Sequence, residues 1–90
     1  MKQILFLIFF AYVTQYGATG NQMANGQKPF LGAVACPRNY QLNTTVHFLG
    51  RDWVCADRTA RRYDGRFDIF STGTKEAMLK FGKKLLEVKI

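Results

Sequence analysis

The feature that most constrains the fold is a pair of short apolar segments that each contain an aspartate. Residues 53–57 read WVCAD and residues 66–70 read RFDIF, so Asp57 and Asp68 lie among residues typical of β-strands. A carboxylate in such a strand is costly to bury unless it is paired, hydrogen-bonded or functional. Together with Asp64, these two account for half of the six acidic residues of the chain. We therefore expect any chemistry to lie between Asp57 and Asp68.

The length and charge of the chain limit its organisation and its partners. Ninety residues form one small domain. A domain of this size buries only about 60–65% of its unfolded surface, so a covalent cross-link would add useful stability. The formal charge of +7 indicates a polyanionic partner, such as nucleic acid, anionic lipid or the acidic polymers of a bacterial wall.

The N-terminus reads as a targeting segment. Lys2 is followed by an apolar run that continues to Val13, a pattern typical of a secretory signal. The run is shorter than the roughly 20 residues that span a bilayer. Its residues fit a cleavage site poorly, so an uncleaved anchor or an apolar first strand are alternatives. We expect a signal or apolar segment over residues 1–12, a domain over residues 13–90, and a location outside the cell or in its envelope.

The two cysteines, Cys36 and Cys55, flank a loop of a length that disulfides close well. Such a bridge would contribute about 3 kcal/mol in the chain-entropy account. Export would favour the bridge, and two buried free thiols are the alternative. With only His47 to add and no CxxC spacing, these thiols do not form a zinc site, so we expect no metal.

The remaining pattern predicts several short strands and one helix. Turn-forming residues dominate residues 17–28, and a helix capped by Thr72 or Thr74 is expected to end at Gly82. A hairpin turn is expected at residues 50–52. Strands are predicted over residues 30–35, 41–49, 53–57, 66–70 and 85–90. This content predicts a mainly β protein, folded as a compact barrel.

Several segments, in this order, resemble the three-aspartate (3D) domain family. They are VTQY at residues 13–16, MANG at 23–26, GAVACP at 32–37, LNT at 42–44, the aspartate loop at 57–70, and the Glu76-Ala77 and Phe81-Gly82 pairs. The family is a small double-psi β-barrel, also found at the end of membrane-bound lytic transglycosylase A and in secreted wall-remodelling proteins of spore formers. The resemblance implies a six-stranded double-psi β-barrel with one short helix. The chain departs from the family at Cys36, which replaces the first aspartate, and in the basic loop that follows Asp57.

The resemblance implies activity on peptidoglycan. The transglycosylase cleaves the glycan without water and leaves a 1,6-anhydro end, so one carboxylic acid can donate the proton and then accept another. Asp68 matches the catalytic aspartate of the family, and Asp57 is the expected second catalytic member. Structural alternatives remain: Asp57 can end its strand by accepting backbone hydrogen bonds, and Asp68 can bond into the crossover loops. Asp64, before Gly65, is expected to be a turn residue.

The loop between the aspartates is rich in arginine. The candidate substrate-binding residues are Arg58, Arg61, Arg62, Tyr63 and Arg66. Arginine can bind stem-peptide carboxylates or wall phosphates with two parallel hydrogen bonds, but a solvated face or pairing with Asp57 and Asp64 is the alternative. Trp53 and Tyr40 can stack on sugars or pack in the core. We expect His47 to be an ordinary residue of a strand surface.

Three functions fit these features. The first is a glycan-cleaving enzyme on peptidoglycan, either a lytic transglycosylase or a hydrolase of O-glycosyl bonds. The second is a non-catalytic, expansin-like module that binds cell walls. A nucleic-acid or phage-structural protein is disfavoured, because the basic residues lack the interleaved aromatics of a single-strand binder. We expect glycan strands, and anionic wall polymers with them, as partners, no nucleic acid, no cofactor and a monomer.

Overall fold

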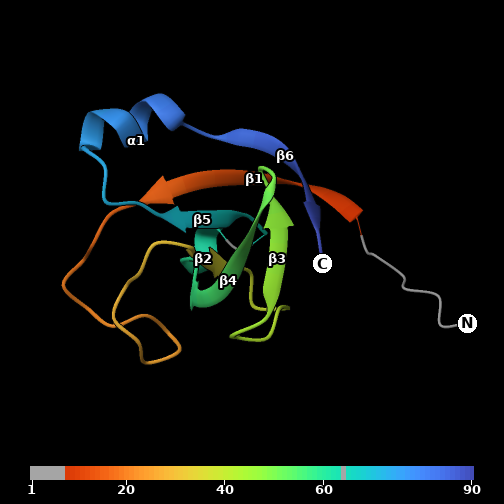
Figure 1. Ribbon diagram of the computed structural model, residues 1–90, viewed down its shortest axis with the longest axis horizontal. Helices are drawn as coiled ribbons and strands as arrows, with labels where there is room; N and C mark the ends of the chain where they lie inside the picture. Colours follow the sequence, from red (N-terminus) through yellow and green to blue (C-terminus); the bar gives the residue numbers. More distant parts are fainter. Residues whose placement is uncertain (1–7, 64) are drawn as a thin grey trace, which may run out of the picture.

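The computed structural model describes residues 8–63 and 65–90, a closed six-stranded β-barrel with one short α-helix (Figure 1). Residues 1–7 of the expected signal segment and Asp64 lie outside the described residues. The elements are β1 (Ile8–Tyr16), β2 (Ala33–Cys36), β3 (Thr45–Phe48), β4 (Arg51–Arg58), the 3-10 turn η1 (Arg61–Tyr63), β5 (Phe67–Phe70), α1 (Lys75–Phe81) and β6 (Lys84–Lys89). The mainly β barrel with a single short helix is therefore confirmed.

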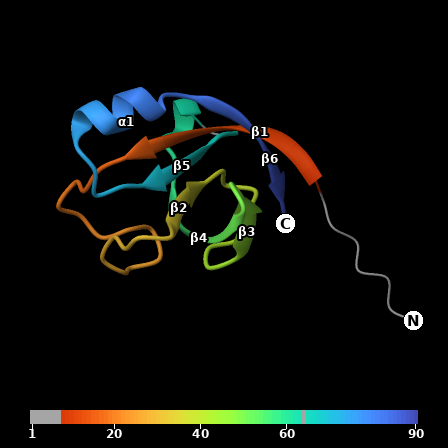
Figure 2. The ribbon, with the colours of Figure 1, turned by 45° about the horizontal axis from the view of Figure 1, so that its top comes forward.

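The strands close in the order β1-β5-β2-β4-β3-β6. The pairs β1–β5 and β2–β4 are parallel, and the other pairs are antiparallel. Such an arrangement is compatible with a double-psi barrel. Strand β1 is long and changes partner, since residues 8–13 pair with β6 and residues 13–16 pair with β5 (Figure 2).

The barrel interior is filled by the inward side of each strand. Val13, Val34, Val46, Phe67 and Val88 are fully buried and come from five different strands. Each such side chain contributes about 1.5–3 kcal/mol through its removal from water. A second, smaller cluster of Met23, Ala33, Ala56 and Phe70 packs apart from this core.

The first strand begins at Ile8, within the segment that the sequence grouped with the N-terminus. Ala11 is buried and Phe9 packs against the core from the same side of β1. Residues 8–12 therefore have a place in the barrel, while the processing of the N-terminus stays a prediction. No helix among the described residues is long and apolar enough to cross a membrane.

The segment that leads into β3 and the following turn differ from the expected pattern. The backbone turns at Asn43 (φ 70°), whose N–H donates to the carbonyl of Cys55 at 2.7 Å, so the strand starts only at Thr45. The hairpin turn is Leu49–Gly50, one residue earlier than expected. Both residues have positive φ (52° and 70°), as a two-residue type I′ turn requires.

Thr74, one of the two expected N-caps, begins the helix, and Gly82 ends it as predicted. The Thr74 hydroxyl accepts the Ala77 N–H at 3.1 Å, and Gly82 ends α1 at φ 65° with its N–H directed to the carbonyl of Met78. The exposed helix packs beside β1.

The disulfide between Cys36 and Cys55 is confirmed. It joins β2 to β4 inside the barrel, with a Cα–Cα distance of 5.6 Å, and both residues are fully buried. The chain between the two cysteines carries β3 and the β3–β4 hairpin, so the bridge holds both ends of this segment together. A bridge over this separation restricts the unfolded chain by about 3 kcal/mol.

We predict that reduction of the Cys36–Cys55 bridge lowers the free energy of unfolding by about 3 kcal/mol. Urea unfolding with and without reductant would measure the change. The Cys36→Ala/Cys55→Ala double variant should match the reduced protein and show no response to reductant. Two free thiols in the unreduced, denatured protein would contradict the prediction.

Candidate functional site

Asp57 and Asp68 meet on the outer face of the barrel. In the strand register Thr14 pairs with Asp68, Asp68 with Ala35, and Ala35 with Asp57. Residues paired directly across neighbouring strands project their side chains to the same face. We call Thr14, Asp68, Ala35 and Asp57 the aspartate row; it crosses β1, β5, β2 and β4.

A β-bulge brings Asp57 into this row. The register between β2 and β4 shifts between Val34 and Ala35, so Val34 faces Cys55 while Ala35 faces Asp57, and Ala56 is skipped. In an unbroken ladder Asp57 would face Cys36, whose side chain lies in the core. The extra residue therefore turns the carboxylate from the interior to the outer face, as bulges do near functional sites.

Asp68 is half-buried, and the Thr14 hydroxyl donates to its Oδ1 at 2.9 Å. Burial raises the pKa of the Asp68 carboxyl, because it penalises the charged form. The hydrogen bond from Thr14 and the charge of Arg66 lower this pKa, while the charge of Asp57 raises it, and the net effect is upward. Asp68 is thus a carboxyl that retains its proton to a higher pH than an ordinary aspartate.

Asp57 is held by three donors. Its Oδ1 accepts the backbone N–H groups of Ala24 at 3.0 Å and Arg58 at 2.8 Å, and its Oδ2 accepts the Tyr16 hydroxyl at 3.1 Å. Burial, followed by the Asp57 charge, raises the pKa of the Tyr16 phenol well above its usual range. Asp57 therefore has the backbone-accepting role that was one sequence alternative, and it also faces Asp68.

Thr14 and Tyr16 were not singled out as site residues from the sequence. They occupy alternate outward positions at the end of β1, after the buried Val13. The signal was the change along the outward side of β1, from apolar residues at positions 8, 10 and 12 to hydroxyl-bearing residues at positions 14 and 16. Only the pairing of β1 with β5 shows that these hydroxyls reach the aspartates.

The arginine-rich loop is partly committed to contacts within the protein. Arg58 donates from Nη1 to the carbonyl of Pro37 at 2.9 Å. Arg66 and Arg62 lie over the Tyr63 ring, with guanidinium carbons 3.9 Å and 4.7 Å from its centroid. The Tyr63 ring thus contacts guanidinium groups and stays partly exposed. Arg61 and Arg62 belong to η1 and are exposed, and Arg66 is the arginine whose charge acts on Asp68.

The other aromatic candidates pack into the barrel. Trp53 is buried, stacks on Phe48 and donates from Nε1 to the carbonyl of Phe48 at 3.0 Å. Tyr40 packs against the core residue Phe67 at 5.5 Å between centroids. His47 lies on the surface of β3, where its Nδ1 bonds Asp52.

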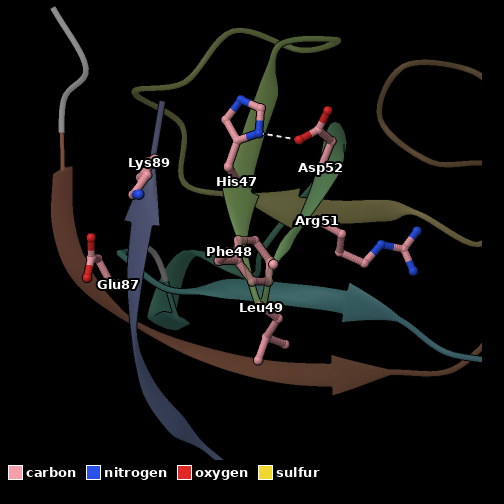
Figure 3. A pocket seen from close by; sticks show the side chains of 8 residues that line it. His47, Phe48, Leu49, Arg51, Asp52, Glu87 and Lys89 are labelled. Carbon is pink, nitrogen blue, oxygen red and sulfur yellow. Dashed lines mark hydrogen bonds and ion pairs between the residues drawn. The ribbon is translucent and has the colours of Figure 1, made fainter.

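Two of the hollows in the described part of the chain flank the barrel. The larger, about 540 Å³, lies between the β3–β4 hairpin and β6 and is lined by His47, Phe48, Leu49, Gly50, Arg51, Asp52, Glu87 and Lys89 (Figure 3). The smaller, about 370 Å³, is lined by Ala18, Gly20, Asn21, Gln22, Lys28, Pro29 and Phe70. Phe70 shares the outer side of β5 with Asp68 and meets Tyr16 edge-on at 5.7 Å. The smaller hollow therefore adjoins the aspartate row.

Its raised pKa suits the Asp68 carboxyl to proton transfer. Within residues 8–63 and 65–90, no group of three His, Cys, Asp or Glu side chains is placed to hold a metal ion.

No protein-family model, curated protein or solved structure matches the chain. The function is therefore inferred from the site itself.

We predict that Asp68→Asn stabilises the protein at neutral pH. A carboxyl whose folded pKa is raised loses stability as the pH rises through that pKa, and the amide removes this loss. The variant should exceed the wild type in Tm near neutral pH by about 4–8 °C for each kcal/mol recovered. The difference should disappear below about pH 4, where the Asp68 carboxyl of the wild type becomes protonated in the folded and the unfolded state alike.

Thermal melts followed by circular dichroism across this pH range would test it. Glu87→Gln, at an exposed carboxyl of β6, is the matched control and should show no such difference. A difference between wild type and Asp68→Asn that is constant with pH would contradict the assignment.

We also predict that Tyr16→Phe destabilises the fold by about 1.5–3 kcal/mol, because it removes a hydrogen bond to a carboxylate. Tyr12→Phe, on the same side of β1 but with an exposed ring, should change the free energy of unfolding little. Urea unfolding compares the two, and equal effects would argue against the bond to Asp57.

Proposed function

We propose that this chain is a peptidoglycan-active, glycan-cleaving enzyme in which Asp68 is the general acid and base. The single observation that carries the proposal is the aspartate row. It sets a half-buried carboxyl of raised pKa beside a second carboxylate on one outer face. Such pairs, whose environments differ, are typical of glycan-cleaving sites. The resemblance to the 3D domain supports the same reading, as does the closed barrel.

The chemistry follows from the contacts of Asp68. The Thr14 hydroxyl occupies Oδ1, which leaves Oδ2 for the acidic proton. Protonated Asp68 donates to the glycosidic oxygen as the bond from the anomeric carbon to that oxygen breaks. The resulting carboxylate then accepts the proton of the 6-hydroxyl of the same sugar, whose oxygen bonds to the anomeric carbon. The product is a 1,6-anhydro end, and Asp68 is protonated again.

Asp57 has a supporting role in this scheme. Its charge raises the pKa of Asp68, so the acid keeps its proton nearer to neutral pH. The three donors fix its orientation, and a fixed negative charge stabilises positive charge that develops on the sugar ring. Tyr16 acts by holding Asp57 in place.

The substrate would extend from the aspartate row into the smaller hollow. Asn21 and Gln22 offer amides for hydrogen bonds to hydroxyl and N-acetyl groups, and Lys28 offers a charge for a stem-peptide carboxylate. Arg66 and the exposed Arg61 and Arg62 would bind further carboxylates or wall phosphates. Because the proposed substrate is peptidoglycan, the protein would act at the cell wall. The disulfide is compatible with an oxidising compartment.

A wall-binding module without catalysis is the second candidate. Neither of the two hollows described above is lined by Asp57 or Asp68, and Cys36 is bonded to Cys55 where the 3D family has a further aspartate. A site with these features can hold a glycan strand without cleaving it.

We predict that the wild type releases anhydro-muramyl fragments from purified peptidoglycan and that Asp68→Asn lowers this release by at least 100-fold, as expected for loss of a general acid. Mass spectrometry of the soluble products gives the readout. Asp52→Asn, the same substitution at an exposed aspartate of β4 outside the aspartate row, is the matched control and should stay within a few-fold of wild type. Release should also fall as the pH rises through the raised pKa of Asp68.

Other products assign other functions. Reducing ends would indicate hydrolysis and would make Asp57 the candidate base that activates water. Protein that sediments with the wall but releases nothing would support the binding module. Full activity in Asp68→Asn would overturn the proposed role of this residue.

A further inference from the structure

The outer surface of β1 and β6 carries large apolar side chains in the open. Ile8, Phe10 and Tyr12, at alternate positions of β1, are 52%, 68% and 47% exposed, and Leu85 of β6 is 58% exposed. Tyr12 pairs with Leu85 in the register, so the four side chains share one side of the two-stranded ladder. We call Ile8, Phe10, Tyr12 and Leu85 the β1–β6 face.

The barrel core does not require the exposed side chains of the β1–β6 face. The other side of β1 already supplies Phe9, Ala11 and Val13 to the core. The outward side of an antiparallel ladder is usually polar, whereas here it is apolar over five residues of β1. Contiguous exposed apolar side chains on a small protein indicate a surface that docks on something.

A lysine lies at each end of the β1–β6 face. The Lys83 ammonium lies over the Tyr12 ring at 4.7 Å, and Lys89 pairs with Ile8. Glu87, opposite Phe10, is the one acidic residue of the two strands. Figure 3 shows Glu87 and Lys89 on β6 beside β1.

We propose that the β1–β6 face docks on an anionic lipid surface. Apolar side chains would enter the boundary between headgroups and acyl chains, while the lysines bind the headgroup phosphates. Tyrosine suits this boundary, because its ring is apolar and its hydroxyl is polar. The ladder between β1 and β6 already satisfies backbone groups along this edge.

The positive charge of the chain favours an anionic lipid surface over a second copy of the chain as the occupant of the β1–β6 face. Each copy carries a formal charge of +7, so pairing two lysine-rimmed faces would bring like charges together. An anionic surface provides apolar depth and the opposite charge at once. In the sequence, the four residues before Ile8 are also apolar, since residues 4–7 read ILFL. The proposal does not depend on the proposed enzymatic function.

Vesicle flotation with the full chain tests the proposal. The wild type should float with vesicles that contain phosphatidylglycerol and much less with phosphatidylcholine alone, and added salt should weaken the binding. The Phe10→Ser/Leu85→Ser variant should bind about tenfold more weakly, because both side chains lose their apolar contact with lipid. Lys83→Gln and Lys89→Gln should each weaken binding about fivefold, while Glu87→Gln should strengthen it.

Leu31→Ser is the matched control. Leu31 is 66% exposed but precedes β2, which neighbours neither β1 nor β6 in the ring, so its variant should bind as the wild type does. Circular dichroism would check that each variant is folded. We expect this, because the substituted side chains are exposed.

Three results would overturn the proposal. The wild type would fail to float with anionic vesicles, or the Phe10→Ser/Leu85→Ser variant would bind as the wild type does, which would assign the binding to residues outside the β1–β6 face. Concentration-dependent dimers in analytical ultracentrifugation that Phe10→Ser/Leu85→Ser abolishes would identify a second copy as the occupant. None of these outcomes bears on the peptidoglycan digest.

Discussion

The pairing of β2 with β4 on one side and β5 on the other is the constraint on which the rest of the structure depends. All four residues of β2 are buried, and its last residue forms the disulfide to Cys55. Because Ala35 pairs with both Asp68 and Asp57, this short strand sets the two carboxylates in one row. A slip of one residue would turn an aspartate into the core, which the core could not accommodate without a partner.

The same arrangement explains how a small domain tolerates buried charge. Ala35 leaves space between the two carboxyls, while Thr14 and Tyr16 reach them from β1 and supply hydroxyl donors. The barrel core beneath is entirely apolar and cross-linked, so the polar groups lie outside it. Strand β1 thus has two uses along one outward side: an apolar half that faces solvent and a polar half that orders the aspartates.

Local patterns predicted much of this fold. Alternation located the strands that carry Asp57 and Asp68, and the Thr74 and Gly82 caps bounded the helix, because these signals depend on neighbours in the chain. The start of β1 was left open between alternatives, since an apolar run reads alike as a signal segment and as a strand with two apolar sides. The hairpin turn was placed one residue too late, because leucine rarely adopts positive φ and so gave no turn signal.

By itself, the sequence determined that this protein is a small, basic, mainly β domain with one capped helix and a cluster of charge between Asp57 and Asp68. Composition and short-range periodicity are sufficient for that. The tertiary structure alone decided that a bulge turns Asp57 outward, that Thr14 and Tyr16 bind the aspartates, and that Trp53 and Tyr40 belong to the core. These features depend on strand pairings between residues far apart in the chain, and no local pattern specifies which strands become neighbours or in which register.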